Sequence, residues 1–192
     1  LYSDVVPKAV DEYLTSIEKF NNQKSNEQLL NPVWHIHNGS PPKEKIIMPF
    51  SMLLNIVGSS NARSKEVLWK FIKKFHNEID PKSHKILDEL TAYAINYFID
   101  EVEPKKKFKK PNNNEKKALE KLINVLKKTS QNTPAEDIQT QIYTIGKENG
   151  YSNNLRDWFK LIYEVFFGEE NGPRMGFFIS FFGVKETIDL ME

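Results

Sequence analysis

The sequence lacks several features that would each point to a particular class of protein. It contains no cysteine, which excludes disulfide bonds and thiolate metal sites. It also has no apolar run close to the roughly 20 residues that a membrane-spanning helix needs. With 27 Lys and Arg against 26 Asp and Glu, it lacks the one-sided charge that draws a whole protein to a polyanion. We therefore expect a cytoplasmic protein with no membrane partner, in which any affinity for nucleic acid comes from local clusters.

The motifs of a self-contained active site are lacking as well. No glycine cluster precedes a Lys-Ser or Lys-Thr pair, so there is no phosphate-binding loop. Ser59 and Ser60 have no nearby His or Asp that would suggest a nucleophile triad. Glu164, Glu169 and Glu170 could act as general acid and base, but a solvated acidic face explains them better. We expect no catalytic residue in this chain.

A histidine pair is the one arrangement that suggests a metal. His35 and His37 flank Ile36, next to Trp34, and on an extended segment both rings would point to the same side. No carboxylate stands at a supporting spacing, although a metal site needs at least a third ligand. Two imidazoles that hydrogen-bond loop carbonyls are the better interpretation, and we expect no metal site.

What the sequence does contain is helical periodicity. Hydrophobic residues make up 39% of the chain and aromatic residues 12%, enough for a substantial core. Apolar residues recur at three- and four-residue spacing, and no pair of strands is evident. A first helix would be capped by Ser3, and Asn153 or Asn154 would cap a later one. Helices are expected over 3–20, 50–57, 63–77, 86–103, 115–128, 135–150 and 155–167, with two more before the C-terminus, and an ordered loop over 31–49.

This pattern predicts an all-α protein, a multi-helix bundle of two helical subdomains. The segment 103–114 reads as a linker or docking loop, so we place the subdomains at 1–104 and 111–192. On the apolar face of the helix at 63–77 we expect Val67, and on that of the helix at 86–103 we expect Tyr93. Because the chain starts at Leu1, in the middle of a pattern and without Met, we expect a fragment of a longer protein.

A lysine run is the first candidate binding feature. Between residues 101 and 128 there are ten lysines and four glutamates, a local net charge of +6. Such a cluster would attract phosphates with an affinity that falls as salt rises. A solvated linker explains the run equally well. Its five cations within six residues are Lys105, Lys106, Lys107, Lys109 and Lys110.

The aromatic segment 155–191 is the second candidate. Trp158 could stack on an unpaired base, while Arg156, Lys160 and Arg174 could pair with phosphates or base edges. The helical spacing also allows the aromatic residues to pack inward and form core. Aromatic density alone does not decide between a core and a binding surface.

Several longer segments resemble a known family. They are DVVPKAVDEY at 4–13, NPVWHIHNG at 31–39, PFSMLLNIV at 49–57, LRDWFKLIYEVFFG at 155–168 and GPRMGFFISFFGVKET at 172–187. In order and spacing they resemble the C-terminal region of class I lysyl-tRNA synthetases, the archaeal-type enzymes that some bacteria also have. The resemblance covers nearly the whole chain, and the first segment matches the junction where that region begins.

The resemblance implies a function for the chain and for its parent. The parent enzyme activates lysine with ATP and Mg²⁺ and esterifies tRNA(Lys). Its catalytic motifs, of the His-Ile-Gly-His and Lys-Met-Ser-Lys-Ser types, are absent here, so the fragment by itself should neither aminoacylate nor hold a cofactor. It resembles the α-helical cage that grips the anticodon loop of tRNA(Lys), whose UUU or CUU bases identify that tRNA. We expect the fragment to be a monomer.

Two alternatives stay open. The anticodon-binding domain of a glutamyl-tRNA synthetase is related in this part and would prefer another anticodon. A helical scaffold that binds protein would explain the near-neutral charge without RNA. No motif fixes the base-contacting residues, so Arg174, Arg156, Trp158 and Lys160 are candidates by position and chemistry, with the lysine run 105–110 on phosphates.

Overall fold

The computed structural model describes residues 5–192, so the proposed Ser3 cap and Asp4 of the junction segment lie outside the described residues. Within 5–192 the chain forms eleven α-helices and no strand, which confirms the all-α prediction. The α-helices are α1 (Val5–Asn22), α2 (Ser25–Gln28), α3 (Pro32–Ile36), α4 (Phe50–Ser60), α5 (Lys65–Phe75), α6 (Lys85–Tyr97), α7 (Asn113–Leu126), α8 (Ala135–Gly146), α9 (Leu155–Phe166), α10 (Met175–Phe182) and α11 (Val184–Met191).

Three short non-α segments extend these helices. A π-helical turn, η1 (Phe98–Val102), and a 3-10 turn, η2 (Glu103–Lys105), prolong α6 up to the lysine run. A second π-helical turn, η3 (Lys147–Tyr151), prolongs α8 and ends where Gly150 takes a left-handed φ of 96°. None of the helices described in residues 5–192 is both long and apolar enough to cross a bilayer.

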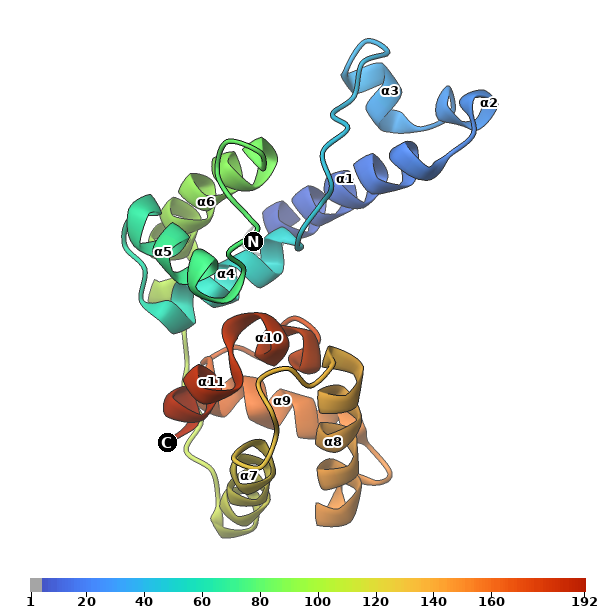
Figure 1. The fold of residues 1–192 in the computed structure, drawn as a ribbon. Coiled ribbons are helices and arrows are strands. Elements are labelled where there is room, and N and C mark those ends of the chain that lie inside the picture. The colour runs from blue at the N-terminus through green and yellow to red at the C-terminus, as the bar shows by residue number, and fades with distance from the viewer. Residues whose placement is uncertain (1–4) are drawn as a thin grey trace.

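The helices form two groups with a projecting arm (Figure 1). Helices α4 to α6 make one group, from which α1, α2 and α3 extend, and α7 to α11 make the other. A single cluster of buried side chains includes residues from both groups. Between α5 and α10, the rings of Phe71 and Phe182 stack with centroids 4.8 Å apart. The division into subdomains at 104 and 111 stays a prediction.

Polar side chains fix where several helices begin. Asn112 and Glu115 form a reciprocal capping box at the start of α7. Asn154 caps α9, as predicted, because its side chain accepts a hydrogen bond from the backbone N–H of Arg156. Two further caps come from distant parts of the chain. Asp11 on α1 accepts from the Phe50 N–H at 2.5 Å, and Glu44 accepts from the first turn of α6.

The structure departs from the sequence prediction in three places. The loop predicted over 31–49 begins with a short helix, α3, because Asn31 caps it and Pro32 is tolerated in its first turn. Val67 and Tyr93 were assigned to apolar faces, but their side chains are 47% and 64% exposed, so both assignments were wrong. The inward face of α5 is carried by its neighbours Leu68, Trp69 and Ile72 instead.

Candidate nucleic-acid interface

Helix α9 is strongly amphipathic, and its tryptophan lies on the buried side. Trp158 is 0% exposed, and its indole N–H donates a hydrogen bond to the carbonyl of Ile142 on α8 at 3.0 Å. The ring fits there because residue 146 is glycine: a Cβ at Gly146 would lie 2.5 Å from Trp158 Cδ1. A ring enclosed on all sides has no face for an RNA base. The structure therefore corrects the prediction for Trp158, whose role is to pack α9 against α8.

The three basic candidates meet around one hollow. Arg156 and Lys160 on α9 and Arg174, just before α10, line a pocket of about 240 Å³. Three aromatic residues line the same pocket: the buried Tyr163, Tyr143 on α8 and Phe159 on α9. The rings of Tyr143 and Phe159 meet edge to face with centroids 5.2 Å apart. Cations beside accessible ring faces are the combination that holds an unpaired base and its phosphate.

Two cations of the pocket, Arg174 and Lys160, are paired with carboxylates, of which Glu136 and Glu170 are exposed and Glu164 is half-buried. The guanidinium of Arg174 forms a bidentate pair with the Glu136 carboxylate at 2.8 and 2.5 Å. The ammonium of Lys160 lies 3.3 Å from Glu170 and 3.5 Å from Glu164, and its hydrogen bond with Glu170 raises the pKa of Lys160. Exposed ion pairs contribute little stability. A phosphate can therefore replace Glu136 at Arg174, or Glu170 at Lys160, at a small cost in stability.

A buried tyrosine fixes the turn that carries Arg174. The hydroxyl of Tyr163 donates a hydrogen bond to the carbonyl of Pro173, and burial raises the pKa of this phenol well above its usual range. The Tyr163 ring also lies so close to Gly172 that there is no room for a side chain there. The turn is thus held at a defined distance from α9, which positions Arg174 at the rim of the pocket.

The lysine run lies outside this pocket. Its backbone is fastened to the end of α9, because the Lys107 N–H donates to Gly168 O at 2.9 Å and the Lys109 N–H to Glu164 O at 3.0 Å. Residues Lys105 to Lys107 line a different groove, of about 1180 Å³, between α1, α4 and the 168–172 turn. The structure therefore does not join the run to the arginines.

Three of the five lysines in the run are engaged by acidic residues of the chain itself. Lys105 pairs with Glu101 at 2.5 Å, and Lys109 with Glu115 at 2.8 Å. The side chain of Lys106 is only 14% exposed, and its ammonium lies over the Phe98 ring and 3.7 Å from Glu169.

Burial lowers the pKa of Lys106, in spite of the nearby Glu169 carboxylate. Lys107 and Lys110 are exposed, and neither forms an ion pair with any residue between 5 and 192. Two cations of the run are therefore available to a phosphate, rather than the five that the sequence suggests.

Comparison with known proteins gives one consistent result. The chain is similar to lysine–tRNA ligases. It is 40% identical over 192 residues to the lysine–tRNA ligase of Roseobacter denitrificans and 40% identical over 194 residues to that of Rickettsia felis. The corresponding protein of Rickettsia bellii is 39% identical over 194 residues. In each case the match covers 100% of this chain but only 36% or 37% of the relative.

The chain thus spans little more than a third of the length of these lysine–tRNA ligases. No family model matches the chain. No solved structure matches it either.

The histidine pair that lies in one of the resembling segments has ordinary partners. His35 Nε2 lies 3.0 Å from the carbonyl of Leu29, and His37 Nε2 lies 2.7 Å from the hydroxyl of Tyr13. The carbonyl partner was predicted for His35, whereas His37 contacts a side chain of α1 instead. Among residues 5–192, no three His, Asp or Glu side chains come together in a way that could hold a metal ion.

Sequence reasoning missed Tyr143 as a residue of the pocket. Its spacing with Ile138, Ile142 and Ile145 is that of a residue on the inward side of α8. In the structure it lies at the edge of that side and is 38% exposed. The signal that could have found it is the angular offset of 100° between neighbours on a helix, which turns Tyr143 away from the fully buried Ile142.

Proposed function

We propose that this chain is the part of a class I lysine–tRNA ligase that binds the anticodon loop of tRNA(Lys). The observation that carries the proposal is the similarity of the entire chain to lysine–tRNA ligases at about 40% identity. The pocket formed by Arg156, Lys160 and Arg174 supports it, because it combines cations with accessible aromatic rings. The parent enzyme would be cytoplasmic and would attach lysine to tRNA(Lys).

The chemistry of that attachment would belong to the rest of the parent enzyme. ATP and Mg²⁺ supply the activation of lysine there. The residues described here do not fit a magnesium site, since no three acidic or histidine side chains gather. The part described here would bind the RNA and orient it without catalysing a step.

The pocket would act on a base that has left the stack of the anticodon loop. Such a base can lie against Tyr143 and Phe159, while Arg174 or Arg156 reaches its edge or its phosphate. Uracil offers few exocyclic donors, so the shape of the pocket and hydrogen bonds to the Watson–Crick edge must select it. The volume of about 240 Å³ suits one base rather than several.

The test is a titration of the 192-residue chain with fluorescent anticodon stem-loops at about 50 and 200 mM salt. We expect the stem-loop of tRNA(Lys) to bind at least about tenfold more tightly than one with an AAA anticodon, with an affinity that falls as salt rises. A stem-loop of tRNA(Glu) that bound more tightly than that of tRNA(Lys) would favour the glutamyl alternative. If no stem-loop bound, the remaining alternative would be a helical scaffold that binds protein.

A further inference from the structure

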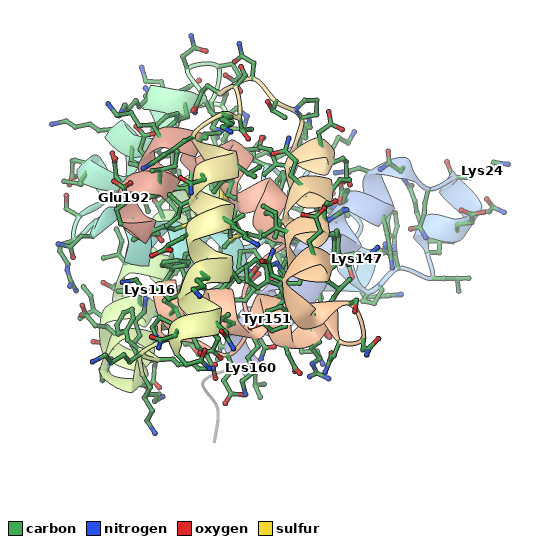
Figure 2. The ribbon with its side chains drawn as sticks, turned by 90° about the horizontal axis from the view of Figure 1, so that it is seen from below. Lys24, Lys116, Lys147, Tyr151, Lys160 and Glu192 are labelled. Carbon is green, nitrogen blue, oxygen red and sulfur yellow. The ribbon has the colours of Figure 1, made fainter. Side chains whose placement is uncertain are left out.

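The lysines of α7 and of the two positions that follow it, Lys127 and Lys128, form two groups. Lys127 pairs with Glu192 at 2.5 Å, and Lys116 lies 4.0 Å from Glu120. Figure 2 labels Lys116 and Glu192 on the side of α7 that faces away from α8. The charges on this side of the helix are thus balanced within the chain.

The second group lies on another side of the helix. Lys117, Lys121 and Lys128 are exposed, and none of them forms an ion pair with any residue between 5 and 192. An offset of four residues places Lys117 and Lys121 on one side of α7, and Lys128, which follows the C-cap of the helix, lines the same groove as Lys121; these three lysines are called the stripe below. Lys121 donates a hydrogen bond to the neutral side chain of Asn149 beyond α8 at 2.6 Å, which orients the ammonium without cancelling its charge.

A groove between α7 and α8 contains two lysines of this stripe, Lys121 and Lys128, and Lys117 lies one helical turn before Lys121, outside the lining of the groove. The groove has a volume of about 410 Å³, and Lys121 and Lys128 line one side. The opposite side, on α8, carries the uncharged side chains Thr140, Gln141 and Thr144. The hydroxyls of Thr140 and Thr144 donate to the backbone carbonyls four residues earlier, so among these three the amide N–H groups of Gln141 are the donors left for a ligand. Hydroxyl and amide side chains next to lysines are the groups that contact phosphate and sugar oxygens. The carboxylate of Glu148 is the one acidic group that lines the groove within the described residues.

The stripe has the right length for several phosphates. At 1.5 Å per residue, Lys117 and the last residue of α7, Leu126, are about 14 Å apart along the helix axis, and Lys128 follows two residues later. One strand of a DNA duplex carries a phosphate about every 3.4 Å along its axis, and on this scale the stripe is long enough to meet several phosphates of one strand.

Helix α8 separates this groove from the pocket described above. Thr140 and Thr144 line the groove, whereas Gln139 and Tyr143 line the pocket on the other side of the same helix. Figure 2 shows α7 and α8 side by side, with Lys160 of the pocket below them. One helix diameter of about 10 Å therefore lies between the two hollows.

We propose that the α7–α8 groove binds the sugar-phosphate backbone of the anticodon stem, while a loop base enters the pocket across α8. This inference rests on the proposed function and adds a second contact surface to it. The groove would supply affinity that does not depend on sequence, because its cations meet phosphates, and the pocket would supply the preference for one loop.

The test compares two triple variants that remove equal charge. K117A/K121A/K128A removes the three positive charges of the stripe. The control K116A/K127A/K185A removes three other exposed lysines, which lie outside the groove. Each is titrated with the tRNA(Lys) stem-loop between about 50 and 300 mM salt, and circular dichroism verifies the fold. We expect the stripe variant to bind at least about tenfold more weakly at low salt, with a salt slope reduced by about 2 to 3. The control should change the slope by less than about 1.

Further arms separate this inference from the proposed function. K117R/K121R/K128R keeps the charge and should keep the slope. The stripe variant should weaken tRNA(Lys) and AAA stem-loops by the same factor, since backbone contacts carry no sequence information. Equal salt slopes for the stripe and control variants would contradict the proposed role of the groove in binding RNA. Its lysines would then be candidates for binding an acidic protein partner. If the stripe variant lost its salt slope while the unmodified chain showed no preference between the two anticodons, the proposal for the groove would stand. The proposed anticodon function would then be refuted.

Discussion

The inner and outer faces of α9 and α10 come from one short stretch of sequence, yet they have different roles. Trp158 and Phe178 on the inner face are fully buried. Arg156 and Arg174, on the outer side, are exposed at the rim of the pocket. The comparison teaches that most aromatic side chains of this segment build the core, and that its basic side chains, with Phe159 beside them, are the ones left at the pocket for the binding proposed above.

The inner face predicts the largest effect on stability. Trp158→Ala removes a fully buried ring and its hydrogen bond to Ile142, and leaves a cavity between α8 and α9. We expect a loss of about 3–5 kcal/mol in the free energy of unfolding, measured by urea denaturation followed by circular dichroism. Trp34→Ala, at a half-buried position in the arm, should cost less. Near-equal stabilities of the wild type and the Trp158 variant would contradict the assignment of this ring to the core.

A glycine on the same face predicts the next effect. Gly176 lies where α10 touches α8, and its N–H donates to the buried Gln139 side chain at 2.7 Å. A Cβ at Gly176 would lie 2.7 Å from the backbone nitrogen of Gln139 and closer still to the carbonyl of Ala135. Gly176→Ala should therefore cost about 1–3 kcal/mol of stability, although alanine favours a helix by about 1 kcal/mol over glycine.

The matched control for this variant is Ser180→Ala on the same helix, which removes a hydroxyl without a steric clash and should leave the midpoint of urea denaturation nearly unchanged. Because Gln139 and Met175 line the pocket, the Gly176 variant should also bind the tRNA(Lys) stem-loop more weakly. A Gly176 variant as stable as the wild type would mean that α8 and α10 can move apart freely.

The sequence predicts the helices far better than it predicts the contacts between them. A helix such as α9 follows from its apolar spacing and from Asn154, because both the periodicity and the cap are local. The pairing of Arg174 with Glu136, 38 residues away, depends on how α8 and α10 pack. The same holds for Asp11, which caps α4 from a position 39 residues earlier. The net charge counted along the sequence likewise overestimated how many lysines of the run are available to a phosphate, because their acidic partners are contributed by other elements of the fold.

The outer face predicts a change in binding with almost none in stability. Arg174→Ala removes a cation from the rim of the pocket and breaks an exposed pair with Glu136, so unfolding should shift by less than about 0.5 kcal/mol. Binding of the tRNA(Lys) stem-loop should weaken by about 1–3 kcal/mol if the guanidinium reads a base edge. Calorimetric titration measures this loss.

Glu136→Gln is the variant that separates the arginine from its ion pair. It breaks the same pair but leaves the guanidinium free, and it removes a negative charge that competes with RNA for Arg174. Its affinity for the stem-loop should therefore equal or exceed that of the wild type. If both variants lost affinity equally, the ion pair would matter only for the shape of the rim. If neither lost affinity, Arg174 would not contact the RNA, and Arg156 would become the principal candidate on the outer face.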